Sequence, residues 1–229
     1  MSSEGRWSVA WARSTHHLRV VEPSMSEVAA YAPRLSAYYN EPHNRAMLAH
    51  TQEMSIDDVI AHYRALRGEQ GHPLVLLRDE RLVGDADLRG IGGGHGELAI
   101  MIGDRSLQGQ GLGTAFGIMA HALAFRVLSL TRTYVSILPE NAASLRLFQR
   151  LGYAIDDSPP ARAIADEPGD VTMALDRARF EHTFGKELAT LRFVPAPASE
   201  PAAGGPEPSQ GSGSDRPEPS QGSGSDDGL

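Results

Sequence analysis

The sequence predicts an α+β domain built on a mixed β-sheet and flanked by helices. Strand-like and helix-like segments follow one another in the order βααβββαβαβ(β), with antiparallel strands first and a βαβ unit near the middle. Inside that unit, the glycine-rich residues 108–114 join a strand to a helix. From Pro195 onward the chain is rich in Pro, Gly and Ser and offers little apolar surface to bury. We therefore expect one folded domain over residues 18–194, between a flexible segment at 1–17 and a disordered tail at 195–229.

The first half of the domain predicts two helices and four strands. Ser24 or Ser26 caps the first helix, and a capping-box variant, Ser55-x-x-Asp58, opens the second. Glycines at 90–96 predict a turn before the last of these strands. The helices are expected to end near Tyr38 and Gly68, and the strands to span residues 18–21, 74–77, 82–88 and 97–102.

The second half predicts helices and strands in alternation. A loop rich in Pro and Asp is expected at residues 157–169. The expected helices span residues 112–129, 142–151 and 176–191, and the expected strands span residues 133–138, 153–156 and 170–175.

Most of the net negative charge lies in the tail. The tail also carries a tandem copy of PEPSQGSGSD, at residues 206–215 and 217–226. The chain has a formal net charge of −8; six acids against Arg216 give residues 195–229 a charge of −5 and leave −3 for the rest. That balance provides no basic stripe for nucleic acid and no polybasic patch for a membrane surface. We expect neither as a partner.

The composition excludes several kinds of chemistry. The absence of cysteine excludes disulfides, thiolate metal sites and a cysteine nucleophile. The nine histidines show no metal-binding spacing such as H-E-x-x-H. Residues 1–17 lack the apolar core of a secretory signal, and no window approaches eighteen apolar residues. We expect a cytoplasmic protein without a bound metal.

The most informative segment is Gln108-Gly109-Gln110-Gly111-Leu112-Gly113-Thr114, which lies between a strand and an apolar helix. Glycines let a backbone approach a ligand closely, and the free N–H groups of the following helical turn attract an anion. A P-loop would need Lys followed by Ser or Thr, and a dinucleotide fingerprint would need G-x-G-x-x-G early in the chain. Neither pattern is present, so the segment predicts another kind of pyrophosphate-binding turn.

A second segment, residues 141–153, follows after one intervening strand. Asn141 is a good N-cap, and the next nine residues are mostly strong helix formers with one broad apolar face. Gly152 lies where a helix ends in the left-handed conformation, and Tyr153 begins a strand.

Together these segments resemble the GNAT superfamily of N-acetyltransferases. The spacing Gln108-x-x-Gly111-x-Gly113 is similar to that family's acyl-CoA pyrophosphate loop, and residues 141–153 are similar to its N-x-x-S/A…L-G-F/Y segment. The run 97–111 looks most like the branch that includes the ribosomal-protein N-terminal acetyltransferases. The resemblance covers about residues 18–176 and is strongest over 82–153.

The resemblance implies a GNAT-like mixed sheet whose strands 4 and 5 splay to admit the pantetheine arm of acetyl-CoA, the co-substrate. It implies an amine-bearing acceptor (a protein N-terminus, polyamine, amino-sugar or small metabolite) and a monomer or homodimer. Backbone N–H groups near Met101 and Ile102 are expected to hold the thioester carbonyl and the pantetheine arm. The other residues expected to contact the co-substrate are Gln108, Gly109, Gln110, Gly111, Gly113, Thr114, Asn141 and Ser144.

Glu97 is the candidate general base, acting through a water. It opens the strand that leads into the glycine-rich turn, and the resemblance places a glutamate there. The same carboxylate could instead be solvated or paired with an arginine. Asp85 and Asp87 share one face of the preceding strand, where they line the amine pocket or face solvent.

One position departs from the family pattern. Many members have a tyrosine seven residues after the asparagine as general acid, and this chain has Phe148. Either Tyr153 or a water replaces that acid, or the thiolate leaves unprotonated, which a free-thiol pKa of about 8.5 permits. Residues 38–45 are expected to connect two helices. The resemblance implies that this region shapes the acceptor pocket; the alternative is an exposed helix connection.

Two other interpretations remain open on the sequence alone. The missing tyrosine permits a non-catalytic acyl-CoA-binding module with a regulatory role. A different nucleotide-binding α/β protein is disfavoured, because the P-loop lysine is missing and the dinucleotide fingerprint is misplaced.

Overall fold

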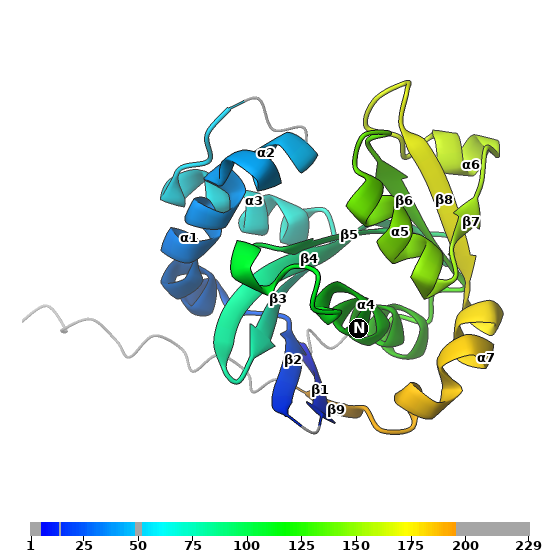
Figure 1. The fold of residues 1–229 in the computed structure, drawn as a ribbon, viewed down its shortest axis with the longest axis horizontal. Helices are drawn as coiled ribbons and strands as arrows, with labels where there is room; N and C mark the ends of the chain where they lie inside the picture. The colour runs from blue at the N-terminus through cyan, green and yellow to red at the C-terminus, as the bar shows by residue number, and fades with distance from the viewer. Residues whose placement is uncertain (1–5, 14, 49–51, 196–229) are drawn as a thin grey trace, which may run out of the picture. The chain divides into compact units, whose positions relative to one another are not determined.

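The computed structural model describes residues 6–13, 15–48 and 52–195 (Figure 1). Its nine strands form one sheet in the order β7-β8-β6-β5-β4-β3-β2-β1-β9. The strands are β1 (Trp7–Arg13), β2 (His16–Val21), β3 (His72–Arg78), β4 (Arg81–Gly92), β5 (His95–Ile102), β6 (Arg132–Ile137), β7 (Ala154–Ile155), β8 (Val171–Asp176) and β9 (Arg192–Pro195).

Helices cover both faces of this sheet (Figure 1). On one face α1 packs on β4 and α3 on β3; on the other, α4 packs on β1, β2 and β5, with α5 and α7 against it. A 3-10 turn, η1 (Arg105–Leu107), precedes α4, and a π-helical turn, η2 (Leu123–Val127), follows it. The helices are α1 (Met25–Asn40), α2 (Pro42–Met47), α3 (Ile56–Gly68), α4 (Leu112–Ala122), α5 (Ala142–Leu151), α6 (Pro159–Arg162) and α7 (Arg177–Leu188).

Strand β3 shows why the core has two halves. Leu74 and Leu76 pack in the large apolar cluster under α4, whereas Val75 and Leu77 pack in the cluster under α1 and α3. Successive side chains of a strand point to opposite faces, so an apolar run such as 74–77 is buried on both. The α+β fold and its mixed sheet are confirmed.

The sheet opens between β5 and β6. These two strands form its parallel pair, and they pair only over residues 95–97 and 132–134. Beyond Glu97 no partner continues the ladder on that edge of β5 within the described sheet, so a gap runs toward Ile102. The expected splay is confirmed at this place; β5 and β6 are the strands that the resemblance counts as 4 and 5.

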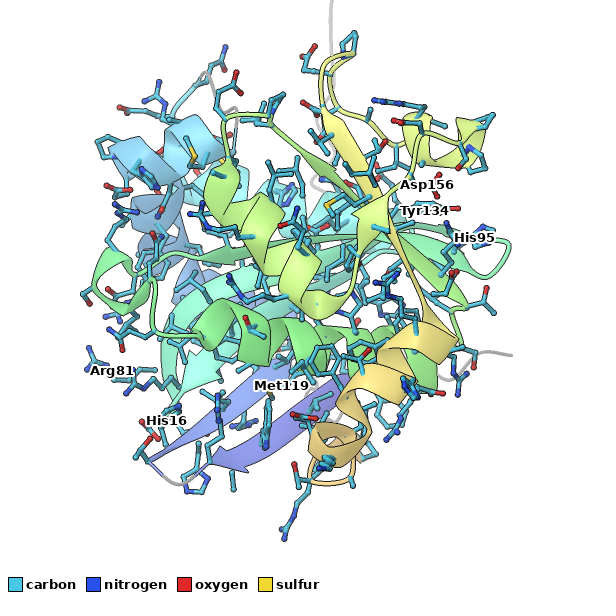
Figure 2. The ribbon with its side chains drawn as sticks, turned by 45° about the vertical axis from the view of Figure 1, so that its right-hand side comes forward. His16, Arg81, His95, Met119, Tyr134 and Asp156 are labelled. Atoms are coloured by element: carbon cyan, nitrogen blue, oxygen red, sulfur yellow. The ribbon has the colours of Figure 1, made fainter. Side chains whose placement is uncertain are left out.

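The closed end of the gap is held by ring and ion-pair contacts. The rings of His95 and Tyr134 meet edge to face, with centroids 5.9 Å apart (Figure 2). Arg132 lies over the Tyr134 ring and pairs with Asp156 at 2.6 Å. The ring contact joins β5 to β6 where the gap begins, and the ion pair ties β6 to the residue that follows β7.

Two strands were missed by the sequence reasoning. The expectation of a flexible segment over residues 1–17 is wrong for residues 7–13, which form β1 and pair with β2 and β9. The apolar alternation of Trp7, Val9 and Trp11 explains the strand, because Val9 is fully buried and both indoles pack against the core. The predicted tail at 195–229 lies outside the described residues except for Pro195, which ends β9.

Several element boundaries also differ from expectation. The helix predicted over 112–129 ends as an α-helix at Ala122 and continues as the π-helical turn. The predicted loop 157–169 contains the short helix α6, and the predicted link 38–45 includes most of α2. Proline begins both missed helices, since its fixed φ suits the first helical turn.

Removing strand β9 should lower the thermal stability. We expect a chain ending at Leu191 to melt about 4–8 °C below a chain ending at Pro195, because Phe193 loses its contact with the core and β1 loses a partner, a cost on the order of 2 kcal/mol. Differential scanning calorimetry of the two truncated chains measures this difference. Equal melting temperatures would show that β9 adds no stability.

Candidate active site

The glycine-rich segment forms the turn into α4 that the sequence predicted. Gly109 and Gly111 have φ angles of +75° and +80°, which other residues rarely adopt. Gly111 is the N-cap of α4 and has no side chain with which to cap it, so the first N–H groups of the helix remain for a ligand. A Cβ at Gly109 or Gly111 would meet no atom of the described chain within 4 Å. The turn is therefore open to an incoming anion.

The remaining residues of the turn contact α5. A Cβ at Gly113 would lie 3.4 Å from Leu147, so glycine permits the close packing of α4 on α5. Arg150 Nε donates to Thr114 Oγ1 at 3.4 Å. These contacts place the beginning of α4 beside the basic face of α5.

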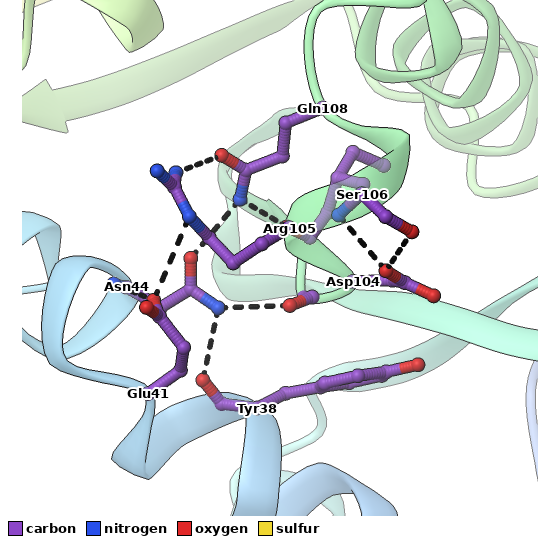
Figure 3. A network of polar contacts seen from close by, with 9 residues as sticks. Tyr38, Glu41, Asn44, Asp104, Arg105, Ser106 and Gln108 are labelled. Carbon is purple, nitrogen blue, oxygen red and sulfur yellow. Dashed lines mark hydrogen bonds and ion pairs between the residues drawn. The ribbon is translucent and has the colours of Figure 1, made fainter.

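A network of polar side chains braces the opposite side of the turn (Figure 3). Gln108 Nε2 donates to Asn44 Oδ1 at 3.0 Å and to the Ile102 carbonyl at 2.7 Å. Asn44 Nδ2 in turn donates to the carbonyls of Tyr38 and Gly103 at 3.0 and 2.9 Å. Asn44, which the sequence reasoning missed, thus ties α2 to the turn.

Gln108 was expected to contact the co-substrate, but its backbone N–H is used within the turn. That N–H donates to the Arg105 carbonyl at 3.3 Å, and the Arg105 guanidinium contacts the side-chain oxygen of Gln108. The side chain of Gln110 also turns back, donating to the Ser106 carbonyl at 2.7 Å. Gln108 therefore supports the turn, and the available N–H groups begin after it.

The phase of the β4–β5 ladder decides which backbone groups of β5 face the gap. The N–H of Gly103 donates to the Val83 carbonyl at 2.9 Å, and hydrogen-bonding direction alternates along an antiparallel strand. With constant register, the N–H of Met101 also points to β4, whereas those of Ile100 and Ile102 point into the gap. The Ile102 N–H therefore faces the gap, whereas the Met101 N–H is used inside the sheet.

A cavity of about 520 Å³ lies over the glycine-rich turn and the gap. Arg146 and Arg150 of α5 supply positive charge to its wall, which suits a phosphate-bearing ligand. We call it the turn-side cavity; its lining includes Ile100, Met101, Ile102, Gln108, Gly109, Gly111, Gly113, Thr114, Asn141 and Ser144.

A second cavity, of about 450 Å³, lies beside the α1 and α3 face of the sheet, and we call it the acidic cavity. Both cavities are lined by Met47, Leu48, Ile100, Met101, Asn141 and Ser144, so they meet at the gap. The lining of the acidic cavity combines Arg89 and His62 with six carboxylic acids: Asp85, Asp87, Glu97, Asp166, Glu167 and Asp170.

Asn141 stands where the cavities meet. Its Oδ1 accepts the N–H of Ser144 at 3.0 Å, which confirms the predicted N-cap of α5. Its Nδ2 donates to the Met47 carbonyl at 3.2 Å and so links α2 to α5 across the gap.

Asp85 is an anchored carboxylate. The hydroxyls of Tyr39 and Tyr63 both donate to its Oδ2, from Tyr63 at 3.2 Å. Burial raises the pKa of Asp85 to about 6, against the opposing effect of these hydrogen bonds. Burial also raises the pKa of both tyrosines, which keeps their hydroxyls protonated. Asp85 thereby fastens α1 and α3 to β4.

Glu97, the candidate base, lies in the acidic cavity but is paired. Arg89 donates from Nε and Nη2 to its two carboxylate oxygens at 2.9 and 2.7 Å. The two residues face each other across β4 and β5, and the hydrogen bonds with Glu97 raise the pKa of Arg89. Pairing with an arginine was the alternative left open for Glu97. Arg89 itself was missed, although its alternation with Asp85 and Asp87 places it on the same face.

Asp87 lies between Asp85 and Arg89 on the same face of β4. It faces Ala99 across the ladder, and its Oδ1 is buried without a hydrogen-bond donor among the described residues. The Nε of Arg89 is 3.9 Å from that oxygen. Burial raises the pKa of Asp87 to about 7; Arg89 opposes the rise, and the charges of Asp85 and Glu97 add to it.

Tyr153 is not among the residues that line either cavity. Its hydroxyl is hydrogen-bonded to His121 Nε2 at 2.7 Å and to Thr133 Oγ1 at 2.8 Å, in the core under α4. Burial raises the pKa of Tyr153 and lowers that of His121 to about 4. Phe148 does line the acidic cavity. Tyr153 therefore cannot replace the missing acid in this arrangement.

Within the described ranges, no group of three or more His, Cys, Asp or Glu residues is placed to hold a metal ion. Among the same residues, no helix has both the length and the apolar character needed to cross a membrane.

The fold is similar to those of several acetyltransferases of known structure. RimJ of Mycobacterium smegmatis, solved with CoA-disulfide, has 16% identity and a TM-score of 0.63, over 80% of this chain and 95% of that chain. The aminoglycoside acetyltransferase AAC(6')-Ib with coenzyme A has 19% identity and a TM-score of 0.60, over 72% and 98%. Spermidine N-acetyltransferase of Vibrio cholerae with CoA and spermine has 16% identity and a TM-score of 0.57, over 71% and 97%. None of the curated proteins matches the chain.

The family model described as "Acetyltransferase (GNAT) domain" matches residues 18–154, and the chain belongs to this family. It is therefore an acyl-CoA-dependent N-acetyltransferase with acetyl-CoA as co-substrate.

Proposed function

We propose that this enzyme transfers an acetyl group from acetyl-CoA directly to an amine that enters through the acidic cavity. The observation that carries the proposal is the meeting of two cavities of opposite character at the gap between β5 and β6. One has an anion-binding turn and arginines, and the other has several carboxylates. A thioester from one side and an ammonium from the other would meet beside Ile100 and Ser144.

The turn-side cavity fits the pyrophosphate and pantetheine parts of acetyl-CoA. The N–H groups from Gly109 to Thr114 donate to no backbone carbonyl among the described residues, and they would bind the pyrophosphate. The N–H groups of Ile100 and Ile102 would pair with the pantetheine arm, as a missing strand would. Asn141 and Ser144 border the path proposed for the pantetheine arm, and Asn141 also serves as a helix cap.

The reaction requires few groups from the protein. The acceptor ammonium loses one proton, and the amine nitrogen attacks the thioester carbonyl, so that a C–N bond forms and the C–S bond breaks. The sulfur leaves with the electron pair, and the second amine proton goes to water or to the thiolate. Placing the two substrates together supplies much of the rate, since well-oriented reactants have effective molarities of about 10⁵ M or more.

The acidic cavity favours a cationic acceptor. Its carboxylates outnumber its arginine and histidine, and such a wall attracts positively charged ligands. A protein N-terminus, a polyamine, an amino-sugar or a small amine would all carry that charge. Proteins of this fold include ones named for aminoglycosides and for spermidine.

A non-catalytic acyl-CoA-binding module is the second candidate function. Phe148 in place of the usual tyrosine favours it, because no side chain of the expected type supplies a proton to the thiolate. A thiolate of near-normal pKa can leave unprotonated, so we prefer the enzyme.

The decisive experiment combines binding and turnover. Calorimetry would measure acetyl-CoA binding, and free-thiol release with mass spectrometry would follow acetylation of a panel of peptides, polyamines, aminoglycosides and simple amines. We expect thiol release in step with acetylated product. Tight acetyl-CoA binding without product from any amine would favour the non-catalytic module.

We place the enzyme in the cytoplasm, consistent with a chain that has no cysteine. We propose that it is a monomer or homodimer.

A further inference from the structure

We infer that Asp87, rather than Glu97, takes the proton from the acceptor ammonium. The inference rests on the proposed function and assigns the base within the acidic cavity. The carboxylates of the cavity differ in the hydrogen bonds that they already accept.

Other acids of the cavity are already supplied with donors. Glu97 accepts two hydrogen bonds from Arg89, and Asp85 accepts hydroxyls from Tyr39 and Tyr63. Asp170 Oδ2 accepts from the Ser136 hydroxyl at 2.7 Å and from a backbone N–H at 3.2 Å. Hydrogen bonds of this kind stabilise the charged form of a carboxylate and so make these oxygens weaker proton acceptors.

Asp87 has an oxygen without such a donor. Its Oδ1 is buried, and no described group donates to it. A buried acceptor left without a donor costs about 1–3 kcal/mol, and more when it is charged. An ammonium N–H in the cavity would remove that cost. The site is therefore incomplete in the way expected of one that awaits a donor.

The surroundings of Asp87 give access to a substrate. Across the ladder stands Ala99, whose small side chain lines the same cavity. Ala99 lies between Glu97 and Met101 on β5, one step from the Ile100 N–H that faces the gap. A nitrogen above Ala99 would lie beside Asp87 and approach the place expected for the thioester.

The charges that face Asp87 come from two strands and one loop. Arg89 and Asp85 flank it on β4, Glu97 lies on β5, and Asp166 extends from the loop before β8, with its Oδ2 3.5 Å from Arg89 Nη2. Burial affects Asp87 more than these charges do, and the pKa of Asp87 rises to about 7. A base is most effective when its pKa is near the working pH.

Asp87 accepts the first proton that the acceptor ammonium releases, and every proton of the reaction is then accounted for. The acceptor RNH₃⁺ gives one proton to ionised Asp87 and becomes RNH₂, which attacks the thioester. After the C–S bond breaks, the second proton passes to water or thiolate, and Asp87 returns its proton to solvent. Glu97 and Arg89 form a fixed ion pair that keeps one carboxylate charged next to the arriving ammonium; they are positioning residues.

The test compares Asp87→Asn with Glu97→Gln in the full chain, using kcat/KM against pH from 5.5 to 9.5. With an active amine, Asp87→Asn should lower kcat/KM at least tenfold at pH 7 and remove the rise with pH that has its midpoint near 7. Glu97→Gln should retain that rise whatever its effect on KM. Acetyl-CoA binding by calorimetry and the melting temperature serve as folding controls. Retention of the rise in Asp87→Asn, or its loss in Glu97→Gln alone, would overturn the inference.

A second measurement does not depend on turnover. Carboxyl ¹³C NMR of the wild-type protein, with Asp87→Asn for assignment, should show one aspartate titrating near neutral pH that is absent from the variant. If no amine is acetylated but this titration is found, the proposed function fails while the assignment of Asp87 as a proton acceptor is upheld. An Asp87 resonance that titrates below pH 5 would contradict the assignment.

Discussion

Asp87→Asn should make the protein more stable at pH 8 while leaving its stability at pH 4 nearly unchanged. Burial raises the pKa of Asp87 from 3.8 to about 7 in the folded chain. Between these values the folded state holds a proton that the unfolded state has lost, so stability falls as pH rises and the loss is complete above pH 7. About three pKa units correspond to about 4 kcal/mol. Asparagine does not titrate and avoids that cost.

Urea unfolding of wild type and variant from pH 4 to 8.5 measures this difference. We expect the free energy of unfolding of Asp87→Asn to exceed that of the wild type by a margin that grows up to about pH 7 and then levels off. Asp156→Asn is a control of opposite sign, because hydrogen bonds from Ser158 lower the pKa of Asp156 to about 2. It should be less stable than the wild type by a nearly constant margin over this range, because Asp156 takes up its proton only below about pH 4 in both the folded and the unfolded state. A pH-independent difference for Asp87→Asn would contradict the expectation.

This cost to stability has a physical meaning for the site. A protein that needed only a packed core would place an apolar residue, or a fully hydrogen-bonded one, opposite Ala99. Asp85, on the same face of β4, shows how this fold accommodates a structural carboxylate, since two tyrosine hydroxyls donate to it. Asp87 Oδ1 has no such donor among the described residues, which supports a functional reason for its presence.

The parts of the fold that depend on local signals were predictable from the sequence. Ser55 and Asn141 cap α3 and α5 as expected, and Gly152 ends α5 with φ of +97°. Gly109 and Gly111 of the turn adopt positive φ angles, which glycine permits. These outcomes depend on a few neighbouring residues, so a short sequence window contains the necessary information.

Features built from distant segments were harder to predict. Strand β9 depends on pairing with β1, which lies about 180 residues earlier in the chain. The Arg89–Glu97 pair depends on the register of two strands, and the core position of Tyr153 depends on His121 and Thr133. Glu97 lines the acidic cavity, and whether its carboxylate is free or paired is set by Arg89 across the sheet.

Gly111→Asp should raise the acetyl-CoA dissociation constant at least tenfold, which corresponds to about 1.4 kcal/mol. The carboxylate would project into the open space over the turn, where the pyrophosphate is expected to bind. Two unit charges 4 Å apart repel by about 1 kcal/mol in water and by about 4 kcal/mol near a protein surface. Because the added Cβ meets no described atom within 4 Å, the folding cost is limited to the positive φ, which Asp and Asn tolerate better than other residues.

Gly111→Asn is the matched control, since it has the same shape and backbone strain without the charge. Calorimetry with acetyl-CoA should show a loss of only a few-fold for Asn and at least tenfold for Asp, with similar melting temperatures for the two variants. The difference between them should shrink at 1 M salt, where the Debye length falls to about 3 Å. If Asp and Asn bind equally well at low salt, no anion lies at the turn, and the pyrophosphate must bind elsewhere in the turn-side cavity.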